Sequence, residues 1–441
     1  MKSYFARDAL LPDGWARDVC MVVDEEGNFS AIRTNEKGGE ALPGPVLPGM
    51  ANLHSHAFQR AMAGLTEIRS RPDDDFWSWR ELMYRFVERL SPAQARAVAR
   101  HLYIEMLKHG YTAVGEFHYV HDASEEMYLG HLEAAQETGI AITLLPSMYR
   151  WSNFGGKALQ PRQQRFDSDP AFTLKLMEKA RALACADIRA GVAPHSLRAV
   201  DPGSLRELLA SLPADCPVHI HTAEQTKEVE DCVAALGKRP VEWLLDNLPV
   251  DERWCLVHAT HMTAAETVAL AKSGATAGLC PTTEGNLGDG IFPLLAYREA
   301  GGSYGIGGDS HVSRDPAEEL RLLEYVQRLT ARRRNLAVGS VSRAVGTTLW
   351  LEAAAAGKVL GRAMGAIAPG MRADLVVLDA MHPDLAEKSG DAIANALIFS
   401  GATGLVRDVM VGGKWAVRER RHALEEKAQT AYVRAVSELL N

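Results

Sequence analysis

The sequence has few cysteines, and none of them lies in a pattern that builds a metal site or a disulfide framework. The six cysteines of this 441-residue chain are scattered, without a CxxC pair. Such scattered cysteines are typical of free thiols in a reducing compartment. The first twenty residues also lack the apolar core of a secretory signal. These absences predict a cytoplasmic protein.

Long hydrophobic runs are missing as well, and so is an excess of basic charge. The longest uncharged stretch worth considering, residues 392–406, contains Asn395, Ser400 and two glycines, and it is too short to span a bilayer. The chain carries 56 acidic and 48 basic residues, for a formal charge of −8. This balance argues against a surface for nucleic acid or anionic lipid. We therefore expect neither a nucleic acid nor a membrane among the partners.

The middle of the chain alternates short apolar runs with longer amphipathic ones, which is the pattern of repeated βαβ units. Helical patterns such as Pro92–His109 and Ala264–Lys272 lie between the runs. The eight runs cover residues 49–53, 111–115, 141–145, 189–193, 218–221, 254–258, 275–279 and 303–307. Eight repeats fit a barrel better than an open sheet. We therefore predict an α/β fold with a (β/α)₈ TIM barrel, in which the chemistry lies at the carboxyl ends of the strands.

Both ends of the chain have a β-rich character. The run Val19–Val23 precedes a turn at Asp24–Asn28, residues 373–378 and 409–417 resemble it, and a polar helix is expected from about Leu424 to Leu440. We expect a small β-sandwich domain formed from both termini. The predicted division is 1–46 for the first part of the sandwich, 47–365 for the barrel, and 366–441 for the second part with the C-terminal helix.

Histidines and a carboxylate stand at the ends of several predicted strands. His54 and His56 end the first strand, and residues i and i+2 of a strand point to the same side. His221 ends the fifth strand, His258 ends the sixth and Asp309 follows the eighth. All these strand ends open onto one mouth of the barrel. Their nitrogen and oxygen atoms suit zinc or iron, so the sequence predicts a metal site there.

This arrangement resembles the amidohydrolase superfamily, whose members also have a passage similar to Pro369–Leu375. The mononuclear deaminase branch implies a set of metal ligands and a neighbouring catalytic histidine, His258. The implied ligands are His54, His56, His221 and Asp309. Binuclear members bridge two ions with a modified lysine from the fourth strand, but that strand ends here in Ala193–Ser196, without lysine. One Zn²⁺ per chain is therefore expected, with Fe²⁺ as the alternative.

Glu224 lies three residues after His221, in the HxxE signature of these deaminases. The resemblance implies that a metal-bound hydroxide attacks the carbon of an amidine. The metal lowers the pKa of its water from 15.7 towards about 7. Glu224 would carry the proton to the departing nitrogen, a role worth roughly 10² to 10⁴ in rate. Asp309 would also orient the water, and His258 would stabilise charge on the attacking oxygen.

Several hydrogen-bond donors and cations also lie near strand ends or in segments expected to fold over the mouth. They are Gln59, Arg80, Tyr119, His195 and Arg198. The planar guanidinium of arginine suits a carboxylate, and two such groups suit a dicarboxylate. We therefore predict that these residues bind a small dicarboxylate substrate.

Four segments are similar to motifs of the N-formimino-L-glutamate deiminases. They are Asn52–Gly64, Phe76–Arg80, Gly115–Tyr119 and Ala193–Arg198. The resemblance implies hydrolytic deamination of N-formimino-L-glutamate to N-formyl-L-glutamate and ammonia in histidine degradation. Two alternatives remain: an aminopurine or pterin deaminase of the same superfamily, and a barrel without catalysis that serves as an interaction scaffold. A homodimer is expected, because it is the commonest assembly.

Overall fold

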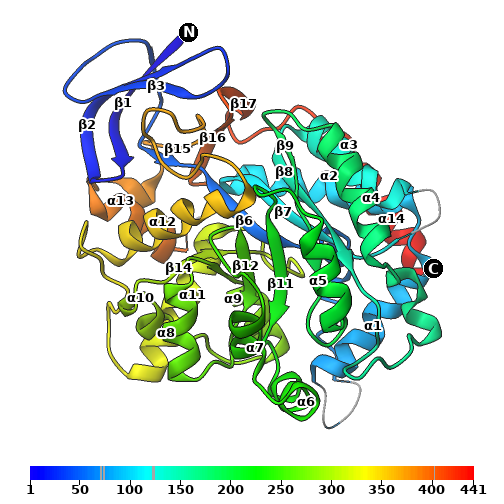
Figure 1. Ribbon diagram of the computed structural model, residues 1–441. Helices are drawn as coiled ribbons and strands as arrows, with labels where there is room; N and C mark the ends of the chain where they lie inside the picture. The colour runs from blue at the N-terminus through cyan, green and yellow to red at the C-terminus, as the bar shows by residue number, and fades with distance from the viewer. Residues whose placement is uncertain (70–71, 73–74, 122–124, 402) are drawn as a thin grey trace.

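The computed structural model describes residues 1–69, 72, 75–121, 125–401 and 403–441. Parallel strands lie at its centre with helices around them, and a sheet built from both ends of the chain lies at one end (Figure 1). The central strands form two parallel sheets, with the orders β10-β8-β7-β6 and β11-β12-β13-β14; β9 also pairs with β8. Three isolated parallel bridges connect the two sheets at their edges: Ser55 with Asp309, Val192 with Val218, and Ser196 with His221.

All eight predicted runs contain strands. The bounds are Met50–Ser55 (β6), Tyr111–His118 (β7), Ala141–Met148 (β8), Ile188–Ala190 (β9), Ala193–Pro194 (β10), Val218–Thr222 (β11), Trp254–His258 (β12), Thr276–Leu279 (β13) and Ser303–Ile306 (β14). This order of strands and helices is a TIM-barrel-type α/β fold. Among the described residues the two sheets are joined at two places by isolated bridges rather than by continuous pairing.

The fourth strand is divided at Gly191. A Cβ atom at this position would lie 2.6 Å from the carbonyl oxygen of Pro217 and 2.6 Å from Cδ2 of Leu145, so a side chain would force its neighbours apart. The Gly191 N–H donates to the Leu144 carbonyl at 3.1 Å, and the Val192 N–H donates to Pro217 at 2.9 Å. The backbone thus changes its hydrogen-bond partner here, from β8 to the residue before β11.

The helices that surround the strands begin and end at clear signals. Helix α2 covers Pro92–His109, as predicted, because the Ser91 hydroxyl caps its start and Gly110 ends it in the left-handed conformation. The predicted helix Ala264–Lys272 is α8. The other α-helices are Phe76–Arg89 (α1), Glu126–Thr138 (α3), Pro170–Ala182 (α4), Pro202–Ala210 (α5), Thr226–Leu236 (α6), Pro240–Asn247 (α7), Pro281–Leu287 (α9), Leu294–Glu299 (α10), Pro316–Ala331 (α11), Val345–Ala355 (α12), Asp391–Phe399 (α13) and Glu425–Leu440 (α14). Short 3₁₀ helices are Ala57–Met62 (η1), Pro161–Phe166 (η2), Ala356–Leu360 (η3) and Pro383–Leu385 (η4).

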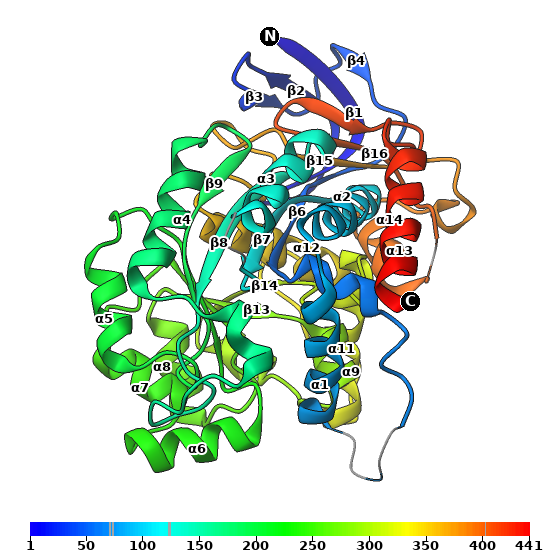
Figure 2. The ribbon, with the colours of Figure 1, turned by 90° about the vertical axis from the view of Figure 1, so that its right-hand side faces the viewer.

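The two ends of the chain share one sheet of eight strands, in which β4 lies beside β1 and the order is otherwise β17-β16-β15-β5-β1-β2-β3. The strands are Lys2–Leu11 (β1), Gly14–Val23 (β2), Phe29–Arg33 (β3), Glu40–Ala41 (β4), Val46–Pro48 (β5), Leu375–Leu378 (β15), Val406–Val411 (β16) and Lys414–Val417 (β17). The expected joining of both termini is present, but as one mixed sheet where a sandwich was predicted. The predicted polar helix is α14, and it packs against α2 (Figure 2).

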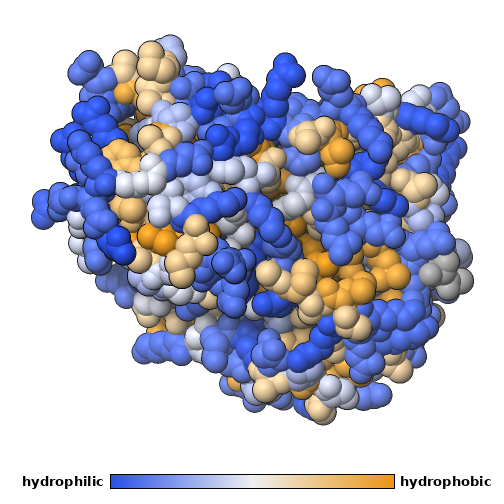
Figure 3. All heavy atoms as spheres, turned by 90° about the horizontal axis from the view of Figure 1, so that it is seen from above, coloured by the Kyte–Doolittle hydropathy of each residue, from blue (hydrophilic) through white to orange (hydrophobic). Residues whose placement is uncertain are grey.

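The face that carries this terminal sheet is mainly hydrophilic, with smaller hydrophobic areas between the polar ones (Figure 3). Within the described parts of the chain, no helix has the length and apolar character needed to cross a membrane.

Candidate metal centre and substrate pocket

Backbone hydrogen bonds join the ends of the first and eighth barrel strands. The Asp309 N–H donates to the His54 carbonyl at 2.9 Å, and the His56 N–H donates to the Asp309 carbonyl at 3.0 Å. Asp309 and His258 both have a positive φ, of 48° and 66°. This conformation costs a non-glycine residue on the order of 1 to 3 kcal/mol and is concentrated at functional sites. Both residues with this conformation, Asp309 and His258, lie at or just after the end of a strand.

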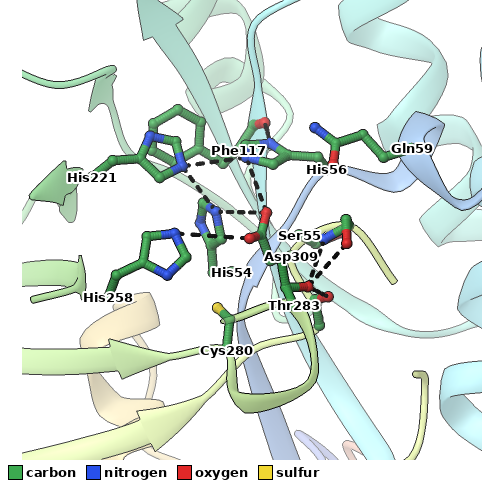
Figure 4. A network of polar contacts seen from close by, with 12 residues as sticks. His54, Ser55, His56, Gln59, Phe117, His221, His258, Cys280, Thr283 and Asp309 are labelled. Carbon is green, nitrogen blue, oxygen red and sulfur yellow. Dashed lines mark hydrogen bonds and ion pairs between the residues drawn. The ribbon is translucent and has the colours of Figure 1, made fainter. Parts of the chain in front are cut away.

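The four predicted ligands point toward one another (Figure 4). Nε2 of His221 lies 3.0 Å from Nε2 of His54 and 3.3 Å from Nε2 of His56. Oδ1 of Asp309 lies 3.5 Å from Nε2 of both His54 and His56. All four residues are buried. The structure therefore brings together three imidazole nitrogens and one carboxylate oxygen from β6 and the residue after it, from β11, and from the segment after β14.

Hydrogen bonds at Nδ1 fix the tautomers of His56 and His221. Nδ1 of His56 lies 2.7 Å from the carbonyl oxygen of Phe117, and Nδ1 of His221 lies 2.9 Å from that of His195. A carbonyl oxygen can only accept, so each Nδ1 carries the hydrogen and each neutral ring presents a lone pair at Nε2. Two lone pairs that face each other at 3.3 Å repel unless a cation lies between them. The residues therefore fit a metal ion.

Burial supports the same protonation state. It holds the pKa of His54 and His221 well below the ordinary value, with neighbouring imidazoles adding to the effect. Burial also lowers the pKa of His56, although Asp309 and the hydrogen bond to Phe117 oppose this. Neutral imidazoles and one carboxylate are common ligands of zinc.

Glu224 and His258 lie beside this cluster. Nε2 of His258 lies 3.7 Å from Oε1 of Glu224 and 3.8 Å from Oδ2 of Asp309. Burial raises the pKa of the Glu224 carboxyl to about 7, while His258 lowers it and Asp309 raises it. A carboxyl that titrates near neutral pH can both accept and give a proton, which general acid–base catalysis requires.

The five predicted substrate residues line one pocket together with His56, His221, Glu224, His258 and Asp309. Within the described chain, Nε and Nη1 of Arg80 and Nη1 of Arg198 are buried without a hydrogen-bond partner. The guanidinium carbons of Arg80 and Arg198 lie 4.5 Å and 5.8 Å from the ring centroid of Trp77. Burial and the charge of Arg198 lower the pKa of Arg80. Guanidinium groups with unpartnered N–H donors suit carboxylates.

The remaining predicted residues, Gln59, Tyr119 and His195, line the same pocket. Nε2 of Gln59 donates to the Tyr119 hydroxyl at 2.7 Å, and Oε1 of Gln59 is buried without a partner among the described residues. The His195 ring centroid lies 4.7 Å from that of His221.

The structure adds residues that the sequence analysis did not select. Glu284 lies 3.3 Å from Nδ1 of His258, and a ligand atom of Cys280 lies within 4.8 Å of those of His258 and Asp309. Both residues follow the seventh strand, so their position at a strand end could have indicated them. Tyr84 and Tyr149 also line the pocket, but no local pattern distinguishes them from core aromatics.

Comparison of the chain with known proteins identifies its family. The profile described as the amidohydrolase family matches residues 46–416, and the profile described as the N-terminal domain of formimidoylglutamate deiminase HutF matches residues 1–42. This chain belongs to the amidohydrolase family. It is 51% identical to a formimidoylglutamate deiminase of Pseudomonas aeruginosa, over 100% of both chains.

Solved structures of the family give the same result for the fold. A crystal structure of an amidohydrolase from Brucella melitensis superposes with a TM-score of 0.94 at 45% identity and covers 100% of both chains. An adenosine deaminase from Xanthomonas campestris, solved with bound zinc, gives a TM-score of 0.80 at 21% identity and covers 99% of this chain and 98% of its own. The second likeness concerns the fold alone.

Proposed function

We propose that this amidohydrolase hydrolyses N-formimino-L-glutamate to N-formyl-L-glutamate and ammonia, a reaction of histidine degradation. The observation that carries the proposal is the pair Arg80 and Arg198, whose unpartnered guanidinium nitrogens are buried and which line one pocket with the histidine and aspartate cluster. Two cations suit the two carboxylates of this substrate. The full-length similarity to a formimidoylglutamate deiminase supports the same activity.

One Zn²⁺ per chain, with Fe²⁺ as the alternative, would be held by the three converging Nε2 atoms and Oδ1 of Asp309. When bound, the ion supplies an acidified water, because it lowers the pKa of that water to about 7. The Nδ1 hydrogen bonds of His56 and His221 to backbone carbonyls keep both rings in the orientation that this site requires.

The proton steps belong to Glu224 and His258. Oε1 of Glu224 would accept one proton of the attacking water and deliver it to the formimino nitrogen. His258 lies near both Glu224 and Asp309, so its Nε2–H can donate to the oxygen on which negative charge develops. The second proton of that water would pass from the new hydroxyl group to the same nitrogen, so that the C–N bond breaks, ammonia leaves and the formyl C=O bond forms.

The distal part of the substrate would lie toward α1 and the segment after β10. Arg80 comes from α1 and Arg198 from the segment after β10, and we propose that each guanidinium binds one carboxylate. Gln59, Tyr119 and His195 would complete the pocket between these cations and the metal cluster. Holding both ends of the substrate places the formimino carbon near Glu224 and so lowers the entropic part of the barrier.

Ammonia release tests this function. Metal-loaded protein should release ammonia from N-formimino-L-glutamate with a much larger kcat/KM than from N-formimino-L-aspartate, adenosine, guanine or a pterin. Release from a heterocycle alone would favour a ring deaminase. Release from none of them, in protein that binds its metal, would favour the interaction scaffold.

We also propose a division into three segments: residues 1–46 and 366–441 from the two ends of the chain, and the barrel at 47–365. We propose a homodimeric assembly without nucleic-acid or membrane partners, and a cytoplasmic location. Light scattering during size-exclusion chromatography measures the assembly. A monomeric mass at working concentration would contradict the dimer.

A further inference from the structure

The side chain of Gln163, in the 3₁₀ helix η2, lies behind the substrate pocket with all its polar atoms paired. Its Oε1 accepts the N–H of Gln160 at 3.0 Å. Its Nε2 donates to the hydroxyls of Tyr84 and Tyr149, at 3.1 Å each. Gln163 is 1% exposed. One buried amide therefore connects the loop after β8 with two tyrosines that come from α1 and from the end of β8.

These contacts fix the direction of both tyrosine hydrogen bonds. A backbone N–H can only donate, so the Gln160 contact assigns the amide oxygen of Gln163 and places its NH₂ group against the tyrosines. The two amide hydrogens then serve one phenol oxygen each. Each phenol accepts from Gln163 and keeps its own hydrogen for another acceptor. Among the residues that the structure describes, neither hydroxyl has a recorded acceptor for that hydrogen.

Both tyrosines line the same pocket as Arg80 and Arg198. The guanidinium carbon of Arg80 lies 5.5 Å from the ring centroid of Tyr84. Burial raises the pKa of Tyr84 to about 12, so this hydroxyl keeps its hydrogen at neutral pH. A buried O–H without an acceptor is costly, and a carboxylate that enters the pocket would supply the acceptor.

We propose that Gln163 is a positioning residue that turns the hydroxyl hydrogens of Tyr84 and Tyr149 toward the pocket, where they donate to a substrate carboxylate beside the two arginines. This inference rests on the proposed dicarboxylate substrate and deepens it. The arginines supply the charge, and the tyrosines add two neutral donors whose direction is set before the substrate arrives. Preorganised donors bind without paying for reorientation.

The decisive variant is Gln163→Glu. The carboxylate has nearly the same shape and can still accept the Gln160 N–H, but its second oxygen accepts from the tyrosines and turns their hydrogens away from the pocket. Gln163→Met is the matched variant without added charge. The probe is glutarate, whose binding to metal-loaded protein is measured by calorimetry. A hydrogen bond to a charged group corresponds to roughly 10- to 150-fold in affinity, so both variants should weaken glutarate binding by at least about 10-fold.

A kinetic split and a background test separate positioning from general damage. The carboxylates do not react, so KM for N-formimino-L-glutamate should rise while kcat changes little. Tyr84→Phe and Tyr149→Phe should each weaken glutarate binding. In a protein that carries both Tyr84→Phe and Tyr149→Phe, Gln163→Glu should lower glutarate affinity by less than about a further 3-fold. Effects of residues that share partners are not additive. Simple repulsion by the new charge would persist there.

The proposal is overturned if Gln163→Met binds glutarate like the wild type, or if the full penalty of Gln163→Glu persists in the double phenylalanine background. If the Gln163 variants do not fold, unchanged glutarate binding in both single tyrosine variants overturns it. Wild-type protein that does not bind glutarate overturns it as well. Wild-type protein that binds glutarate but releases no ammonia from N-formimino-L-glutamate contradicts the proposed function, not this inference.

Discussion

The hydroxyl of Ser55 donates a hydrogen bond to Oε2 of Glu116 at 2.6 Å, in the interval between His54 and His56. The same carboxylate accepts the N–H of Ala57 at 2.9 Å through Oε1 and the hydroxyl of Tyr103 at 3.1 Å through Oε2. Glu116 is fully buried. Two of these hydrogen bonds, from Ser55 and Ala57, therefore anchor the segment that carries both histidines to Glu116.

We expect Glu116→Gln to weaken metal binding without removing any ligand. The amide NH₂ group of the variant takes the place of one carboxylate oxygen. It is a donor, so it cannot accept a hydrogen bond that this oxygen accepts in the wild type. Changes in groups that orient ligands typically cost about 10- to 100-fold in metal affinity. Competition with a chelator measures this, with the exposed Glu178→Gln as control. Equal affinity in both variants would show that Glu116 does not position the histidines.

One metal ion per chain is expected at full activity. Elemental analysis of protein loaded to maximal turnover measures the ratio. Removal of the ion with a chelator should abolish turnover and lower Tm, because a ligand of the native state stabilises it. Two equivalents, both needed for turnover, would contradict the mononuclear site.

Glu224→Gln should retain the metal and lose roughly 10² to 10⁴ in kcat, because the amide keeps the shape but cannot relay a proton. Metal content and ammonia release should be measured on the same sample. The exposed Glu230→Gln in α6 serves as control. Wild-type turnover at full metal occupancy would remove Glu224 from the mechanism.

Arg80→Met and Arg198→Met should each reduce kcat/KM for N-formimino-L-glutamate by roughly 10- to 150-fold, the value of one charge-assisted hydrogen bond. Metal content should not change, since neither arginine is a proposed ligand. A substrate with an amide in place of one carboxylate should be less sensitive to one of the two replacements. The control is Arg206→Met, an exposed position in α5.

The opposite result for the arginines would be informative too. If both variants keep the wild-type kcat/KM for the diacid and for the monoamide, the pocket does not bind two carboxylates through these arginines. The ring-deaminase interpretation would then become the stronger one.

The sequence predicts the barrel strands well because each is an apolar run bounded by polar residues, and local pattern determines it. It also locates His54, His56, His221, His258 and Asp309, since the carboxyl ends of barrel strands share one mouth. The structure brings these side chains together. The ligand roles of His54, His56, His221 and Asp309 remain predictions that the metal experiments test, and so does the catalytic role of His258.

Other features depend on contacts between distant segments, which no local pattern contains. The break at Gly191 results from the approach of Pro217. The arrangement of Gln163, Tyr84 and Tyr149 joins α1 to the loop after β8. The sequence predicts β-rich runs at 19–23, 373–378 and 409–417, but their union in a single sheet depends on a pairing of residues 46–48 with 375–377.

That pairing sets an order of events during synthesis. The hairpin of β1 and β2 can form early, because its strands are adjacent in the chain. Strand β5 obtains its antiparallel partner, β15, only after the whole barrel segment has been made. Pairings between such distant residues form slowly, since a long loop must close first. One edge of the N-terminal strands therefore stays without its partner on the ribosome until residues near 378 emerge, and during that interval it is open to pairing with other chains.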